Sequence, residues 1–301
     1  MTHPARAQVV ELRPRRGAVR AALVSLRPRQ WSKNLLLFAG IVFAAKLGDV
    51  IRWGEAVAIL VAYCAASSAA YLVNDLRDAQ DDRLHPVKRH RPIARGELQP
   101  EHALVLAAVL AAAAFAIAAA LGFASLLFLL LFVALQLAYS LGLKRVVLVD
   151  VLVIAGLFVV RAAAGAAAVD VRISGWLLVC AALLALFLAL AKRRGELVLV
   201  RAEEAPGRAA LAGYSLRLVD VLLGVVAAAT AVTYAVYAVT AHTAWMALTV
   251  PFVVVGLGRY LFLVHRHELG EEPEHVLLGD RVVLGSVAGW AVVSAVVLAV
   301  T

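Results

Sequence analysis

Residues 101–142, EHALVLAAVLAAAAFAIAAALGFASLLFLLLFVALQLAYSLG, decide the fold class of this chain. They contain two apolar runs, 101–121 and 124–142, separated by a short break at Gly122. Each run is about 20 residues long, which is the length that an α-helix needs to cross the hydrocarbon core of a bilayer. Their many alanines would let membrane helices approach one another closely. The segment therefore predicts two consecutive transmembrane helices.

Similar apolar runs fill most of the remaining chain. They lie at 34–52, 55–75, 146–168, 175–192, 216–241, 244–264 and 282–300. Hydrophobic residues make up 63% of the chain and charged residues 16%, whereas soluble domains carry about 25% charged residues. We therefore expect an all-α polytopic membrane protein, a bundle of about nine transmembrane helices forming one domain over 26–301. Residues 1–25, rich in Arg, Pro and Ala, are expected to form a mobile basic arm.

The loops between the apolar runs differ sharply in charge. The alternate loops carry Lys46, Arg52 and Arg172, whereas most of the 29 Lys and Arg residues precede the first run or lie in the loops 76–100, 143–146, 192–217 and 265–281. The positive-inside rule then predicts that the N-terminus and the long loops are cytosolic and that the C-terminus lies outside. The net charge of +9 indicates anionic lipids and substrates as partners rather than nucleic acid.

An acidic cluster, NDLRDAQDD at 74–82, follows the second run. If the helix continues, Asp75, Asp78 and Asp82 fall at i, i+3 and i+7 on one face, with Asn74 beside them. Converging carboxylates repel one another, and a hard cation such as Mg²⁺ relieves that repulsion. The alternative is a solvated acidic helix end, which is how we interpret Asp81. We predict a magnesium site on the shared face, which would hold a diphosphate.

The next stretch, HPVKRHRPIA at 85–94, places basic residues directly after this cluster. Two prolines predict a non-helical loop. Lys88 and Arg91 are suited to bind phosphate oxygens. The alternative is ordinary positive-inside loop charge, which explains the number of basic residues but not their position beside the carboxylates.

Two further groups of charged residues lie within or at the end of apolar runs. Asp150 and Arg161 share a face of the fifth run, where they would form an ion pair or line a pocket with Lys144 at its mouth. The stretch Lys192-Arg193-Arg194-Gly195-Glu196 ends the sixth run and is either a snorkelling basic flank or a second phosphate-binding element. Gly142 and Gly165 are expected at close helix contacts.

Metal-bound diphosphate surrounded by Arg and Lys is a leaving group. Its departure from carbon leaves a cation-like centre, and the surrounding charges stabilise the leaving phosphates. A prenyl diphosphate and phosphoribosyl diphosphate both fit this chemistry, and the residues alone do not choose between these donors.

The motifs resemble those of the UbiA prenyltransferase superfamily, which carries NDxxDxxxD after its second span. From about residue 26 onward, the chain is similar to the branch that transfers phosphoribose to polyprenyl phosphates. The resemblance is carried by RPRQWSKN at 27–34, NDLRDAQDDRLHPVKRHRPIARG at 74–96, YSLGLKRVVLVDV at 139–151, AKRRGEL at 191–197 and PEHVLLGDR at 273–281. Superfamily members that use prenyl diphosphates usually have a second Asp-rich motif, and here Lys192, Arg193, Arg194 and Glu196 stand in its place.

The resemblance implies an enzyme that uses Mg²⁺ to transfer 5-phosphoribose from phosphoribosyl diphosphate to polyprenyl (decaprenyl) phosphate, for cell-wall arabinan synthesis. It implies a UbiA-like helical bundle with its active site at the cytosolic face of the plasma (inner) membrane, and a homo-oligomer is compatible with it. An aromatic prenyltransferase of the 4-hydroxybenzoate type and a non-enzymatic transporter are the alternatives. The implied metal ligands are Asp75, Asp78 and Asp82, with Asn74 and Asp150 as further catalytic residues. The implied substrate-binding residues are Gln30, Lys33, Asn34, Lys88, Arg91, Tyr139, Lys144, Arg161, Lys192, Arg193 and Glu196.

Overall fold

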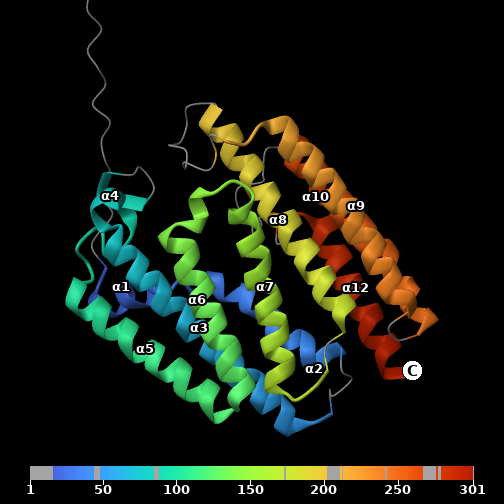
Figure 1. Ribbon diagram of the computed structural model, residues 1–301, viewed down its shortest axis with the longest axis horizontal. Helices are drawn as coiled ribbons and strands as arrows, with labels where there is room; N and C mark the ends of the chain where they lie inside the picture. Colours follow the sequence, from blue (N-terminus) through green and yellow to red (C-terminus); the bar gives the residue numbers. More distant parts are fainter. Residues whose placement is uncertain are drawn as a thin grey trace, which may run out of the picture.

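The computed structural model describes residues 16–43, 48–84, 88–172, 174–201, 211, 213–240, 243–266, 276 and 279–300. Over these residues the secondary structure is helical (Figure 1). The main helices are α3 (Val50–Arg77), α5 (Pro100–Ala120), α6 (Phe123–Leu141), α7 (Val149–Ala168), α8 (Gly175–Arg201), α9 (Leu216–Thr240), α10 (Val250–Arg266) and α12 (Arg281–Val300). Seven helices of the described part are long and apolar enough to cross a bilayer. Helix α12 is also apolar, but its apolar stretch is shorter. The prediction of an all-α membrane bundle is confirmed.

The first predicted span, 34–52, is not one continuous helix. The chain forms a 3₁₀ helix, η1 (Pro28–Phe38), and then a short helix, α2 (Ala39–Phe43). Helix α3 begins at Val50, because the Asp49 carboxylate accepts hydrogen bonds from the backbone N–H groups of Ile51 and Arg52 and caps the helix. This cap lies inside the predicted span, so the boundary was wrong, and the count of nine spans stays a prediction.

Helix α8 is longer than its predicted span of 175–192. It continues to Arg201 because Arg193, Arg194 and Glu196 are accommodated within the helix. Both arginines bond to acidic side chains, and paired charges are far less costly away from water than unpaired ones. The basic stretch therefore forms part of a helix rather than the end of one.

Helix α7 is central to the first half of the bundle. It contacts η1, α2, α3, α6 and α8, while α3 packs on α5, α8 on α9 and α10 on α12. Figure 1 shows α4 (Ala79–Leu84) at one end of the bundle and the C-terminus at the other. The cytosolic side predicted from loop charge corresponds to the end that carries α4.

Residues 18–25 of the predicted arm are folded. They form helix α1 (Ala18–Ser25), which buries Ala21 and Ser25. Just before it, Arg16 pairs with Glu97, with 3.0 Å between guanidinium and carboxylate. The mobile arm was therefore predicted too long at its C-terminal end, and residues 1–15 lie outside the described residues.

Gly165 lets η1 lie directly on α7. A Cβ at Gly165 would lie 1.9 Å from the carbonyl oxygen of Leu37, so the predicted close contact is confirmed. Gly142 has no atom within 4 Å of such a Cβ; it caps α6 instead, and its predicted packing role was wrong.

We expect Gly165→Ala to lower the free energy of unfolding by about 1–3 kcal/mol, because the added methyl group must push η1 away from α7. Denaturation in mixed micelles would measure the change. Gly156→Ala in the same helix is the matched control, since a Cβ there meets nothing within 4 Å. Equal stability of the two variants would contradict the close contact.

Candidate active site

The acidic motif lies where α3 ends and α4 begins. Helix α3 stops at Arg77, and Asp78 forms the turn, yet backbone hydrogen bonds link Asp78 to Asn74 and Asp82 to Asp78. The helical register is therefore nearly kept across the turn. Asp75 and Asp82 lie on one side and are 2% and 3% exposed, although they carry charge.

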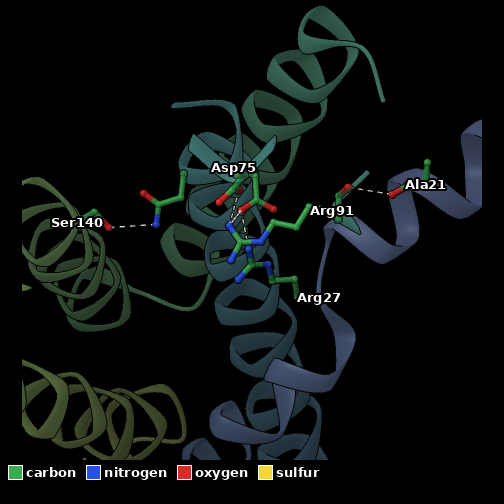
Figure 2. A network of polar contacts seen from close by, with 8 residues as sticks. Ala21, Arg27, Asp75, Arg91 and Ser140 are labelled. Carbon is green, nitrogen blue, oxygen red and sulfur yellow. Dashed lines mark hydrogen bonds and ion pairs between the residues drawn. The ribbon is translucent and has the colours of Figure 1, made fainter. Parts of the chain in front are cut away.

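Arg91 joins these two carboxylates. It follows the 3₁₀ turn η2 (Lys88–His90), and its Nη1 atom lies 3.1 Å from Oδ1 of Asp75 and 2.7 Å from Oδ2 of Asp82. The predicted proximity of the basic loop to the acidic cluster is thus found in the structure. Figure 2 shows Arg91 and a second arginine, Arg27, converging on Asp75.

Arg27 was not among the predicted site residues. Its Nη2 atom lies 2.5 Å from Oδ1 of Asp75, and its guanidinium stacks over the ring of Tyr71 at 4.8 Å from the ring centroid. Arg27 adopts a left-handed conformation with φ 55° at the start of η1, which non-glycine residues seldom adopt. The motif RPRQWSKN begins at this residue, and that was the available sequence signal.

The predicted three-carboxylate cluster is brought together only in part. Asp78 is half-buried at the turn, and its carboxylate lies 3.8 Å from Nε of Arg77. Among the described residues, no group of three His, Cys, Asp or Glu side chains is arranged to hold a metal. Asp78 lies beside Arg77, whereas Asp75 and Asp82 converge on Arg91.

The site nevertheless suits Mg²⁺. Asp75 and Asp82 aim oxygen atoms at one point, which a guanidinium nitrogen of Arg91 occupies, so a cation is already favoured there. Oxygen ligands suit Mg²⁺, which usually takes one or two carboxylates and completes its shell with water and phosphate oxygens. Asp75 and Asp82 would hold the ion, with Asp78 at the edge of the site.

Neighbouring residues connect this site to α6. Asn74 donates a hydrogen bond to the Ser140 hydroxyl at 3.2 Å, and Arg77 donates to the Ser140 carbonyl at 3.3 Å. Lys88 is exposed on η2. The side chain of the predicted residue Asn74 therefore ties α3 to α6, and its part in binding stays a prediction. His85 of the basic loop lies outside the described residues.

A second polar cluster is centred on Asp150, which is fully buried at the start of α7. One carboxylate oxygen accepts from Nε of Arg193 at 2.6 Å, and the other accepts from the Tyr214 hydroxyl at 2.7 Å. The other two guanidinium nitrogens of Arg193 donate to Glu196 and to the Tyr139 hydroxyl. Two ion pairs and two tyrosine hydrogen bonds thus hold α6, α7, α8 and the chain at Tyr214 together.

This cluster changes two predicted roles. Both oxygens of Asp150 and all three guanidinium nitrogens of Arg193 have protein partners. We therefore interpret Asp150 as a positioning residue rather than a catalytic one. Arg193 likewise does not present a donor to substrate, because its side chain is 1% exposed. Tyr214 was missed, since it lies in no recognisable motif.

Arg161 is not the partner of Asp150. Its Nε donates to the Asn34 side chain at 2.8 Å, its Nη1 donates to the Leu157 carbonyl, and its guanidinium lies over the ring of Phe132. The two residues share a helix, but three turns separate them and different neighbours surround them. Of the two alternatives given for these residues, an ion pair between them is not formed, because Asp150 pairs with Arg193; the pocket with Lys144 at its mouth stays a prediction.

The remaining predicted residues lie in three other elements. Lys33 donates to the side chain of Gln30 within η1. Lys144 is half-buried in the turn η3 (Leu143–Arg145) between α6 and α7, and Lys192 is half-buried on α8. Their binding roles stay predictions.

The Tyr214 hydroxyl links the second cluster to the chain before α7. It accepts from the backbone N–H of Leu148 at 2.8 Å while donating to Asp150. Burial is the main cause that raises the pKa of Tyr214 to about 12, and the hydrogen bond to Asp150 is the second. The neutral hydroxyl is thus favoured in the folded protein.

The pKa of Tyr214 is higher in the folded protein than in the unfolded chain, where it is near 10. The stability that its neutral hydroxyl contributes is therefore fully present below pH 10 and is lost as the pH rises toward 12. We expect the difference in melting temperature between wild type and Tyr214→Phe to be constant from about pH 6 to 9 and to vanish toward pH 12. A difference that persists at pH 12 would contradict the bond to Asp150.

Comparisons with known proteins agree with one another on the family that this chain resembles. The family model described as "UbiA prenyltransferase family" matches residues 35–277. The chain is 33% identical to decaprenyl-phosphate phosphoribosyltransferase of Mycolicibacterium smegmatis, over 89% of each chain. It is 34% identical to the protein of the same name from Mycobacterium tuberculosis, over 93% of this chain and 95% of the relative.

The fold resembles that of a solved structure, a UbiA homolog from Archaeoglobus fulgidus bound to DMAPP and Mg²⁺. The TM-score is 0.71, and the alignment covers 93% of this chain and 96% of that one at 20% identity. At this identity, the likeness supports the arrangement of helices and not a shared substrate.

Proposed function

The chain belongs to the UbiA prenyltransferase family, and we propose that it transfers 5-phosphoribose from phosphoribosyl diphosphate to a polyprenyl phosphate such as decaprenyl phosphate. The similarity to the two mycobacterial relatives over about nine-tenths of both chains carries this proposal. The product would supply cell-wall arabinan synthesis. The active site would face the cytosol of the plasma membrane, as the loop charges predict.

The pairing of charges near the end of α8 supports a phosphoribosyl donor over a prenyl diphosphate. Two acidic groups there are Glu196 and Asp220, and they bond to Arg193 and Arg194 respectively. These two carboxylates pair with different arginines, whereas Asp75 and Asp82 converge on one nitrogen of Arg91. The described residues therefore favour a metal site at Asp75 and Asp82.

The reaction needs charge stabilisation and positioning more than proton transfer. An oxygen of the acceptor phosphate attacks the anomeric carbon of the donor, and the bond from that carbon to diphosphate breaks with its electron pair leaving on diphosphate. The acceptor is already an anion near neutral pH, so no general base is required. Bound Mg²⁺ would neutralise charge on the leaving diphosphate. In-line attack inverts the anomeric carbon.

Arg27, Arg91 and Lys88 are the residues suited to hold the phosphates. The side chains of Arg27 and Arg91 are 28% and 27% exposed, whereas the side chains of Asp75 and Asp82 are 3% and 4% exposed. The guanidinium groups therefore lie at the accessible side of the carboxylates. Planar guanidinium groups bind phosphate oxygens in pairs, which favours one orientation of the donor.

The test uses purified full-length protein with labelled phosphoribosyl diphosphate, decaprenyl phosphate and Mg²⁺. We expect a label that partitions into organic solvent as a lipid-linked phosphoribose, and we expect EDTA to abolish it. A parallel reaction supplies a polyprenyl diphosphate and 4-hydroxybenzoate. Formation of the prenylated aromatic acid without the phosphosugar lipid would overturn the proposal.

A further inference from the structure

Arg27 and Arg91 neutralise the carboxylates of the candidate metal site. Asp75 contacts both arginines, and Asp82 contacts Arg91. Two negative and two positive groups are gathered there, so the local charge is balanced. A divalent cation that arrives alone must break these ion pairs before it can bind the carboxylates, and buried ion pairs are costly to break.

The segments that carry the two arginines are anchored together. Arg16, just before α1, and Arg95, beyond Arg91, both pair with the buried carboxylate of Glu97. Ala21 of α1 packs in one cluster with Ile93 of the basic loop. These contacts anchor the backbone on each side, so we expect Arg27 and Arg91 to change partner by side-chain rotation.

We propose that Arg27 and Arg91 are exchangeable ligands: they hold Asp75 and Asp82 while the site is empty, and they turn to the diphosphate when the donor binds with its metal ion. This inference rests on the proposed function. Diphosphate carries more charge than the two carboxylates and offers oxygen atoms in pairs, so it competes well for guanidinium groups. Their departure leaves Asp75 and Asp82 open to the cation.

The exchange makes opposite predictions for two affinities when Arg27 is removed. Without Arg27, the carboxylates are less compensated, so a divalent cation alone should bind more tightly. Diphosphate should bind less tightly, because it loses a guanidinium partner. A simple phosphate-binding role would weaken diphosphate binding alone, and a purely structural role would weaken both affinities.

The experiment measures Mn²⁺ binding by electron paramagnetic resonance on full-length protein in detergent micelles, with and without inorganic pyrophosphate. We expect Arg27→Asn to tighten Mn²⁺ binding about tenfold in the absence of pyrophosphate. It should weaken pyrophosphate binding in the presence of Mn²⁺ by about tenfold or more. Asn tolerates the left-handed backbone that Arg27 adopts.

Arg29→Asn is the matched control. It removes the same charge two positions away, from a side chain that is exposed, and should leave both affinities within about twofold of wild type. Unchanged or weaker Mn²⁺ binding in Arg27→Asn would overturn the exchange. If that variant does not purify as a monodisperse protein, Arg91→Gln is judged by the same two affinities, because Arg91 contacts both carboxylates.

Failure of the exchange and failure of the proposed function give different results. A wild-type protein that binds Mn²⁺ and pyrophosphate and shows the opposite shifts, yet forms no phosphoribosyl lipid, would retain the exchange and refute the donor. A protein that forms the lipid while Arg27→Asn weakens both affinities would retain the function and refute the exchange.

Discussion

Asp82→Asn should lower kcat/KM for phosphoribosyl transfer by a factor of about 100 or more, because it removes a charged oxygen from the point that Asp75, Asp82 and Arg91 share. The substitution keeps the size of the side chain and removes its charge. Initial rates with labelled phosphoribosyl diphosphate at several Mg²⁺ concentrations would measure the effect. Excess Mg²⁺ should restore part of the rate, since the defect lies in cation binding.

Asp81→Asn is the control for this prediction. Asp81 adjoins Asp82 in α4, but its side chain is exposed, and we expect its kcat/KM to stay within about twofold of wild type, as for most exposed surface substitutions. Similar melting temperatures for both variants would show that Asp82→Asn acts on the site rather than on folding. Equal activity of the two variants would refute the metal site at Asp75 and Asp82.

Arg193→Leu should lower the free energy of unfolding by about 3–5 kcal/mol, because it leaves the fully buried Asp150 carboxylate without its cation. Denaturation in mixed micelles would measure the loss. The neighbouring variant Arg194→Leu should cost about 1 kcal/mol, because its partner Asp220 is 36% exposed and water can compensate the charge.

A double variant separates the ion pair from the packing around it. Asp150→Asn removes the stranded charge, so Asp150→Asn combined with Arg193→Leu should be more stable than Arg193→Leu alone. If the double variant is less stable than Arg193→Leu, Arg193 acts through something other than Asp150. If Arg193→Leu is as stable as wild type, the buried ion pair of Asp150 and Arg193 does not contribute to the stability of the fold.

Local patterns in the sequence predicted the class of fold and the closeness of the acidic motif to the basic loop. Apolar runs of about 20 residues report a membrane helix directly, because bilayer thickness sets their length. The spacing of Asp75 and Asp82 placed both on one helical face, and their shared contact with Arg91 is found in the structure. The predicted bounds of the first span and of α8 were wrong, because Asp49 caps α3 and because paired charges let α8 continue.

Segment length and periodicity thus suffice to predict a helical membrane protein with an acidic motif beside a basic loop, because both act within one segment. Which charges meet depends on the packing of the helices, which brings Arg27 to Asp75 and pairs Asp150 with Arg193 rather than with Arg161. Helical spacing reports the face on which a residue lies but not the helix that packs against that face. Partners far apart in the chain are selected by packing and by the cost of leaving a buried charge unpaired.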